Sequence, residues 1–578
     1  MGCADTMDPR KKALLAFCLR DFDARWDERE KLLYSCEGEK GFHGTRESVY
    51  YALALLERDA PGDAERAAGI ISRVNSLQYL CPGQPWHGTF PSFSEHGVPP
   101  MAPECLERLG REGEYALDVF TERLFTRFRE DLAAGGMGDR EAAGIMATLR
   151  TSLRRVWPAV WDTYDPNWRE FILCAYALIL RFFEDRLPPR VAEGMDRAAA
   201  EGIAAAVKRA KSGVTPLNTN VRCVHILTAS MFASRWRDGT LAAYAEESAA
   251  AFLSEYLGSG AAEFNSPTYN GVVLTYTPFM KAFGGPEVRL LGEALDAGMW
   301  SDLAEFYNPA LKNICGPYTR CYEMDLRVHT AIPMLMYLDP FLVPEGELPP
   351  MSAETESAGV LCLGDRMLRE DVRDRLDARP RGERLAERTF RELCERGEPG
   401  RDRSLCTATA YISDTLMYGC LRGSENTSHQ LCALNVFWRA KGGRVSSLRL
   451  LREDRDGLQR HMRTVFFDFT AEKGRIGGTV SNRTGGRIRL VFEFESGGEA
   501  EVRIDGDRLR LDGLVLDGLF VIADLSGNER KASFAMSGPE GRARRFCAAL
   551  EDGETLRADI SLCLETDGSA FPAGGMKG

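Results

Sequence analysis

Over the first 345 residues, hydrophobic side chains recur every three to four positions, which is the spacing of one face of an α-helix. Polar segments that contain proline, glycine or asparagine interrupt the pattern, as in the turn Asp59-Ala60-Pro61-Gly62. No convincing strand-like alternation occurs in this part of the sequence. The pattern predicts helices at residues 9–33, 46–57, 63–78, 114–132, 140–155, 168–184, 192–212, 221–236, 241–257, 272–283, 288–307 and 327–338.

The character of the sequence changes after Leu348-Pro349-Pro350. An arginine-rich connection follows at residues 366–403, and beyond it short runs of alternating hydrophobic and polar residues are separated by Gly-Gly and Asp-Gly turns. Because no helix there is long enough for a crossover, the runs predict an antiparallel β-sandwich. The expected strands are residues 408–418, 433–440, 464–470, 488–494, 501–504, 514–523, 533–537 and 556–564.

The length of the chain bounds its domain organisation. A chain of 578 residues exceeds what one hydrophobic core normally supports. Helical hairpins in series either close into an α/α toroid or stack as a solenoid, and the lack of a fixed-period repeat favours the toroid. We therefore predict a multidomain α and β protein with an α/α toroid at 1–348, a connection at 349–403, an antiparallel β-sandwich at 404–566 and a disordered tail at 567–578.

Composition narrows the range of partners. The net charge of −12 argues against nucleic acid or an anionic membrane as the main partner, and no run of about 18 apolar residues predicts a membrane span. The 16 cysteines lack CxxC pairs and are expected to be reduced, mostly buried thiols. The seven histidines show no metal-binding spacing, so we expect neither a metal nor a cofactor. With no apolar leader, we expect a cytoplasmic protein.

Two polar clusters lie at predicted helix ends in the middle of the chain. The first is Glu263-Phe264-Asn265-Ser266-Pro267-Thr268-Tyr269-Asn270-Gly271, and the second runs from Cys315 to Asp325. Proline and glycine mark both clusters as loops that lead into helices. Each is rich in carboxylates, phenols, amides or guanidinium groups, and we expect the two loops to face one another at the mouth of one substrate cleft.

Several loop sequences, together with this layout, resemble a known group of proteins. The loops His87-Gly88-Thr89-Phe90 and Asp165-Pro166-Asn167-Trp168, with the two clusters above, are similar to those of a microbial family whose reactions are largely uncharacterised. The layout resembles the α/α-toroid carbohydrate-active enzymes, especially lyases of the chondroitin AC lyase, alginate lyase and heparinase type. The resemblance implies an enzyme that cleaves uronic-acid-containing oligosaccharides by β-elimination.

Elimination requires neutralisation of the uronate carboxylate, a base for the adjacent proton and an acid for the leaving oxygen. In the resembled lyases, tyrosine often supplies both base and acid. The resemblance therefore suggests Tyr269, Tyr318 and Tyr322 for proton transfer, with His225, Asn220 and Asn265 as candidate neutralisers. The predicted substrate-binding residues are Arg320, Asn220, Asn265, Tyr322, Trp86, His87 and Asn167.

Two other functions remain open from the residues alone. A glycoside hydrolase needs two carboxyl groups about 5 Å apart, or about 6.5–9.5 Å apart, and the candidates are Glu263 with Asp325 or Glu323. A sugar-binding protein without catalysis is the other alternative, because every one of these polar groups also has a structural explanation. Glu263 and Asn265 are suited to helix capping, Arg320 to an ion pair, and His225 to a core position on an apolar helix.

Overall fold

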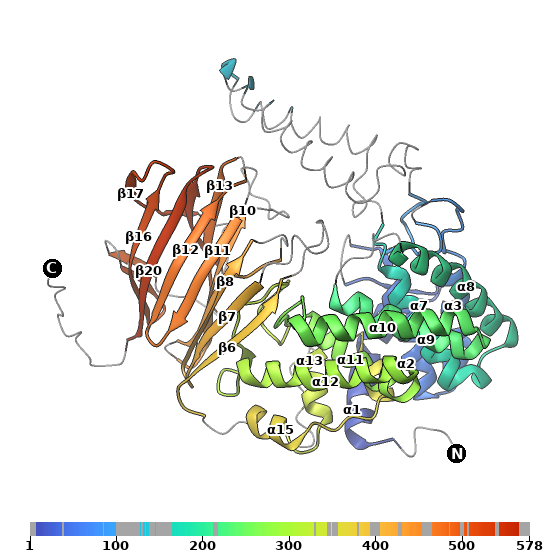
Figure 1. Cartoon of the computed structure of the whole chain (residues 1–578). Helices are drawn as coiled ribbons and strands as arrows, with labels where there is room; N and C mark the ends of the chain where they lie inside the picture. The colour runs from blue at the N-terminus through green and yellow to red at the C-terminus, as the bar shows by residue number, and fades with distance from the viewer. Residues whose placement is uncertain are drawn as a thin grey trace.

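The structure of the protein, a computed structural model, contains a helical N-terminal region and an antiparallel C-terminal sheet, as predicted (Figure 1). It describes residues 7–36, 40–84, 86–99, 128, 131–132, 134–137, 141, 145, 164–211, 218–328, 331–343, 348, 356–377, 381–392, 405–425, 430–440, 442–453, 465–484, 486–496, 502–505, 508–537 and 543–565. The helices predicted at 114–132 and 140–155 lie almost entirely outside the described residues, and the predicted tail lies outside them completely.

The helices of the N-terminal region follow the predicted pattern closely, and most of them differ from it by a few residues at their ends. They are α1 (Pro9–Arg25), α2 (Thr45–Arg58), α3 (Asp63–Asn75), α7 (Trp168–Phe183), α8 (Pro189–Lys211), α9 (Thr219–Trp236), α10 (Gly239–Ser259), α11 (Tyr269–Phe283), α12 (Pro286–Phe306) and α13 (Ala331–Leu338). The 3-10 helix η2 (Glu184–Arg186) follows α7, while α14 (Ala358–Leu363) and α15 (Glu370–Leu376) follow the main helical run.

The long helices pack as hairpins in series. Helices α2, α7, α9 and α11 each pack against the next, and α3, α8, α10 and α12 pack against them. Their apolar faces merge into one buried core, since residues such as Leu53, Ile179, Leu227 and Leu274 are inaccessible to solvent. The predicted loops at 165–168 and 263–271 lead into α7 and α11. Closure of the hairpins into a toroid remains a prediction.

The helical region also contains short strands that the sequence analysis did not predict. They are β1 (Trp26–Asp27), β2 (Leu32–Tyr34), β3 (His43–Gly44), β4 (Tyr307–Asn308) and β5 (Asn313–Ile314). The first three form one small sheet and the last two form another. Strands of two or three residues are too short for period-two alternation to be visible, which explains why this expectation was wrong.

The C-terminal strands form one continuous antiparallel sheet of 15 strands, where the sequence analysis expected a sandwich. The main strand order is β14-β15-β16-β20-β12-β11-β8-β9-β10-β13-β19-β18, while β7 pairs with β8, β6 pairs with β7, and β17 pairs with β16. The strands are β6 (Arg384–Arg391), β7 (Leu405–Ile412), β8 (Leu416–Ser424), β9 (Leu434–Arg439), β10 (Val445–Glu453), β11 (Val465–Glu472), β12 (Arg475–Asn482), β13 (Ile488–Glu495), β14 (Val502–Asp505), β15 (Arg508–Leu511), β16 (Leu514–Ala523), β17 (Glu529–Lys531), β18 (Ala535–Ser537), β19 (Ala543–Leu550) and β20 (Thr555–Leu564).

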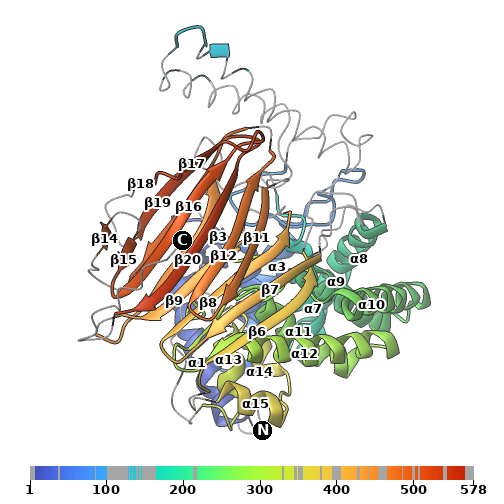
Figure 2. The same ribbon diagram turned by 60° about the vertical axis from the view of Figure 1, so that its left-hand side comes forward.

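This sheet curls so that strands distant in its order pack face to face (Figure 2). The indole nitrogen of Trp438 in β9 donates to the backbone oxygen of Asp512, which follows β15, at 3.2 Å. The rings of Phe492 in β13 and Phe520 in β16 lie 6.0 Å apart. Curling therefore supplies the two-layered core that separate sheets would give in a sandwich.

The edge of the sheet at β6 packs on the helical region. Strand β6 lies inside the predicted connection and pairs with β7, and it is on the side of the sheet nearest to α12 in both views (Figures 1 and 2). The Phe390 ring of β6 stacks on Phe264 at 4.3 Å, and Arg388 donates to Asp302 of α12 at 2.6 Å. The Glu263 loop thus lies beside the junction of the two regions. No described helix is long and apolar enough to cross a membrane.

Candidate functional site

The two polar loops of the sequence analysis contact each other directly. The amide nitrogen of Asn265 donates to the carbonyl oxygens of Cys315 and Pro317 at 2.7 and 3.1 Å. The Thr319 hydroxyl donates to the carbonyl oxygen of Ala262 at 3.1 Å. Asn265 has a positive φ of 55°, a conformation that asparagine tolerates better than most residues. Asn265, predicted to bind substrate, instead joins the two loops.

Glu263 is the buried anion of this site. Its side chain is only 1% exposed and accepts hydrogen bonds from the backbone nitrogen of Asn220 at 2.9 Å and from the Asn220 amide at 2.7 and 2.8 Å. Asn220 lies in the first turn of α9, where backbone N–H groups lack helical partners. Glu263 therefore accepts a hydrogen bond from a backbone N–H group that has no partner within α9. Its negative charge is also favoured by the dipole of the helix.

Arg320 connects this anion to a phenol. Its Nη1 donates to Glu263 Oε1 at 2.6 Å, its Nη2 donates to the Tyr269 hydroxyl at 3.0 Å, and its Nε donates to Gln430 Oε1 at 3.1 Å. Each nitrogen of the guanidinium group therefore contacts a protein acceptor. The guanidinium carbon also lies 4.2 Å from the centre of the Tyr269 ring. The ion partner of Arg320 is Glu263 from the other loop.

Tyr269 begins α11, and its side chain is only partly exposed. The Ser266 hydroxyl accepts from the Tyr269 backbone nitrogen at 3.0 Å, which fixes the first turn of the helix. Burial raises the pKa of the Tyr269 phenol well above its usual value of 10, and the nearby positive charge of Arg320 opposes this rise. The phenol is therefore neutral at pH 7 and lies beside a group that stabilises its anion.

Tyr322 lies next to Tyr269 and leads from the buried cluster to the surface. The two ring centres are 6.0 Å apart, and Tyr322 is 57% exposed. Together, Asn220, Glu263, Arg320, Tyr269 and Tyr322 form one continuous set of contacts, and this set is called the Tyr269 cluster below.

Tyr318 and Asp325, both predicted to be catalytic, are not part of this set of contacts. Tyr318 is inaccessible to solvent, and its hydroxyl donates to the carbonyl oxygen of Ile314 at 2.5 Å. Burial raises the pKa of the Tyr318 phenol well above its usual value. Asp325 accepts from Arg327 Nε at 2.8 Å, and the Arg327 side chain is largely exposed. The structure does not pair Asp325 with Glu263.

His225 and Asn167 belong to a second buried polar group at the start of α7. The His225 ring nitrogen Nε2 contacts the Tyr244 hydroxyl at 2.8 Å, and burial lowers the pKa of His225 to about 4. Asn167 accepts from Arg209 at 3.1 Å. Glu170, which is 4% exposed, lies 3.8 Å from Arg209. The neutral imidazole is bonded within the core, so the structure does not bring His225 to the Tyr269 cluster.

Trp86 and His87 are placed away from the Tyr269 cluster as well. Trp86 is 3% exposed, and its ring packs against Tyr164 with centres 6.0 Å apart. The Nε2 atom of His87 lies 3.0 Å from a carboxylate oxygen of Glu201 in α8. Both side chains therefore hold the loop at residues 81–91 against its surroundings, and the stacking role expected for Trp86 has no exposed ring to support it.

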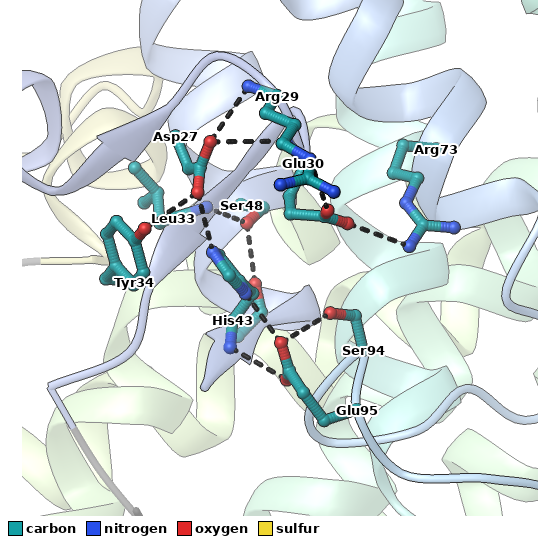
Figure 3. A network of polar contacts seen from close by, with 11 residues as sticks. Asp27, Arg29, Glu30, Leu33, Tyr34, His43, Ser48, Arg73, Ser94 and Glu95 are labelled. Carbon is teal, nitrogen blue, oxygen red and sulfur yellow. Dashed lines mark hydrogen bonds and ion pairs between the residues drawn. The ribbon is translucent and has the colours of Figure 1, made fainter. Parts of the chain in front are cut away.

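The sequence analysis missed two polar arrangements. The first is the contribution of Gln430, for which no signal in the sequence exists. The second is a network around His43, whose Nδ1 lies 2.6 Å from Glu95 and whose Nε2 lies 3.2 Å from Asp27 (Figure 3). The Tyr34 hydroxyl donates to Asp27 at 2.8 Å, which lowers the pKa of Asp27 to about 2. This network joins β1, β2 and β3 to the loop that carries Glu95.

Within the described residues, no group of three or more histidine, cysteine, aspartate or glutamate side chains has the arrangement of a metal site. The described cysteines are free thiols, and most of them are buried. The Tyr269 cluster itself brings together phenol, guanidinium, amide and carboxylate groups. Of its two phenols, Tyr322 is the more exposed, and Tyr269 is the one that accepts a hydrogen bond from Arg320.

Comparison with known proteins gives a partial match. The chain is similar to the solved structure of the Streptomyces coelicolor A3 chondroitin AC lyase in complex with chondroitin sulphate, with 12% identity over 89% of this chain and 82% of that chain and a TM-score of 0.36. No residue role in this chain follows from a likeness at that level. None of the curated proteins matches the chain. Residues 12–103 and 150–345, within the helical region, match the model of a family described as "Domain of unknown function (DUF8769)".

Proposed function

We propose that this protein is a carbohydrate-active enzyme that cleaves uronic-acid-containing oligosaccharides by β-elimination, with Tyr269 as the proton carrier. The observation that carries the proposal is the hydrogen bond from Arg320 Nη2 to the Tyr269 hydroxyl at 3.0 Å. A phenol that accepts from a guanidinium group has a partner that stabilises its anion. Such a phenol is suited to release a proton and to take one back.

In the proposed reaction, the Tyr269 phenolate removes the proton on the sugar carbon next to the carboxylate. The electron pair of that C–H bond forms a double bond to the neighbouring ring carbon, and the bond from that carbon to the glycosidic oxygen breaks. The leaving oxygen then takes a proton from the Tyr269 phenol. One residue thus serves first as base and then as acid, and no external redox partner is needed.

The residues around Tyr269 have supporting roles in this proposal. Arg320 provides positive charge beside the phenol, while the buried carboxylate of Glu263 holds the guanidinium group in place. Because the Arg320 nitrogens each contact a protein acceptor, the geometry favours Arg320 as the partner of Tyr269 over a bidentate grip on the substrate carboxylate. The exposed ring of Tyr322 is placed to stack on a sugar.

The hydrolase alternative receives less support from the same contacts. Glu263 accepts hydrogen bonds from Asn220 and an ion-paired hydrogen bond from Arg320, and it is 1% exposed. A catalytic carboxyl group must contact the substrate, whereas the carboxyl group of Glu263 is enclosed by these donors. Asp325, the second carboxylate of that alternative, is bonded to Arg327.

The test is to incubate the full-length protein with uronic-acid oligosaccharides and with the same oligosaccharides after reduction of their carboxylates to primary alcohols. Elimination needs the carboxylate to acidify the adjacent proton, so we expect cleavage of the acidic substrates and none of the reduced ones. Cleavage of both forms would favour hydrolysis and reject the proposal. Binding of both forms without cleavage would favour a sugar-binding protein.

A further inference from the structure

The second polar loop of the site lies against strands β8 and β9 of the C-terminal sheet. Tyr318 and Cys432 exchange two backbone hydrogen bonds, at 3.0 and 2.9 Å, and the backbone nitrogen of Cys321 donates to the carbonyl oxygen of Gln430 at 2.9 Å. The loop that carries Arg320 is therefore hydrogen-bonded, on both sides of Arg320, to the segment that directly precedes β9. Its position is fixed by a region that follows it by about a hundred residues.

Two glycines allow this close approach. Gly419 of β8 pairs with Asn435 of β9, and the backbone of Gly316 lies on that pair. A Cβ atom on Gly419 would lie 1.7 Å from the carbonyl oxygen of Gly316, and one on Gly316 would lie 1.7 Å from the Asn435 amide nitrogen. The Asn435 oxygen also accepts from the Gly316 backbone nitrogen at 3.2 Å. No side chain fits between loop and sheet at this point.

Gln430 extends this attachment into the Tyr269 cluster. Its side chain is 6% exposed, and its Oε1 accepts from Arg320 Nε at 3.1 Å. The guanidinium group is planar, so an acceptor at Nε fixes the plane in which Nη1 and Nη2 lie. The same plane determines whether Nη1 reaches Glu263 while Nη2 reaches Tyr269.

We propose that Gln430 is a positioning residue for the elimination site, and that the C-terminal sheet thereby sets the hydrogen bond that Tyr269 receives from Arg320. This inference rests on the proposed function. It also implies that the helical region alone does not make a competent site, although the loops with the phenol and the guanidinium group both belong to that region. Gln430 itself does not contact the substrate in this account.

The test uses two substitutions in the full-length protein. Gln430→Met removes the acceptor and keeps a side chain of similar length, while Gln430→Glu keeps an oxygen at the same position. We expect Gln430→Met to lower kcat by about tenfold to a hundredfold with little change in KM, because a small displacement of a catalytic group costs about that much. Gln430→Glu is expected to recover most of the loss, and the pH dependence of Gln430→Met is expected to move toward higher pH because Arg320 stabilises the Tyr269 phenolate less.

A second measurement needs no substrate. Thermal unfolding of the wild-type protein, Gln430→Met, Arg320→Lys and the double variant gives a double-mutant cycle. The inference predicts that the stability losses of the two single variants are coupled, so that the loss in the double variant differs from their sum. Additive losses, or wild-type kcat in Gln430→Met, would overturn the inference. If wild-type protein cleaves no uronate substrate, the proposed function fails, and the inference that Gln430 positions Arg320 is then decided by this cycle alone.

Discussion

Two tyrosines of this protein lie at the end of a charged network, and their hydrogen bonds run in opposite directions. Tyr269 accepts from the guanidinium group of Arg320 at 3.0 Å, whereas Tyr34 donates to the carboxylate of Asp27 at 2.8 Å. The bond to Asp27 raises the pKa of Tyr34, while the charge of Arg320 opposes the rise that burial causes in the pKa of Tyr269.

The difference shows how the surroundings of a tyrosine can suit it to proton transfer in one place and to a structural role in another. Releasing the proton of Tyr34 would put a second negative charge beside Asp27, which costs free energy. Releasing the proton of Tyr269 puts a negative charge beside a cation. The His43 network (Figure 3) is therefore suited to hold β1, β2 and β3 together. The Tyr269 cluster is suited to move a proton.

The largest expected effect separates the two tyrosines directly. Tyr269→Phe removes the proposed base and acid, so we expect kcat to fall by about 10²-fold to 10⁴-fold on a uronate substrate. Tyr34→Phe is the matched control and is expected to keep wild-type kcat. Equal losses of kcat in the two variants, or unchanged turnover in Tyr269→Phe, would contradict the proposed role of Tyr269.

The second expected effect is on stability. Glu263→Gln removes the buried charge partner of Arg320, and we expect the free energy of unfolding to fall by about 3 kcal/mol. Glu255→Gln is the matched control, because Glu255 pairs with Arg222 at 3.0 Å with both side chains more exposed than those of Glu263 and Arg320. It is expected to cost less than about 1 kcal/mol. Urea denaturation of both variants measures the two losses.

The kcat of Glu263→Gln tests whether Glu263 positions Arg320 or takes part in the reaction itself. As a residue that positions Arg320, Glu263 is expected to affect kcat by about tenfold. A general acid or base for hydrolysis would be essential instead. Complete loss of turnover in a variant that remains folded would indicate that Glu263, rather than Tyr269, is the catalytic residue.

The third expected effect is on pH dependence. The pKa of Tyr269 lies well above 10, so the phenolate fraction rises as the pH rises toward it. We therefore expect kcat/KM to increase with pH through the neutral and mildly alkaline range, by up to about tenfold per unit, until another step or unfolding limits it. A pH profile that falls over this range would contradict a tyrosine base.

The smallest expected effect concerns Asp325. Its partner Arg327 is largely exposed, and exposed ion pairs contribute little to stability. We expect Asp325→Asn to change the free energy of unfolding by less than about 1 kcal/mol and to leave kcat near the wild-type value. A large loss of turnover in this variant would restore the two-carboxylate hydrolase alternative.

Much of the layout is visible in the sequence because it depends on local patterns. Helical periodicity predicted the main helices, and proline and glycine marked the loops that carry Glu263 and Arg320. The contacts within the site were harder to predict from the sequence. Tyr318 and Tyr322 are four residues apart in one loop, yet one is inaccessible to solvent and the other is 57% exposed. That difference arises from pairing of the loop with Cys432.

Long-range contacts explain what the sequence analysis missed. Gln430 follows Arg320 by 110 residues, and no local motif indicates that the two side chains meet. Arg320 likewise forms an ion pair with Glu263, which lies 57 residues away along the chain. The register between a loop and a distant strand depends on tertiary packing. The catalytic roles of Tyr269 and its neighbours remain predictions that the following measurement tests.

The most direct measurement compares two products of one reaction. Wild-type protein is incubated with a uronic-acid oligosaccharide, and both the ultraviolet absorbance of unsaturated uronate and the number of new reducing ends are recorded. Elimination creates one double bond for each bond cleaved, so the account predicts a ratio of one, and loss of both signals in Tyr269→Phe. Reducing ends that appear without the absorbance would contradict it.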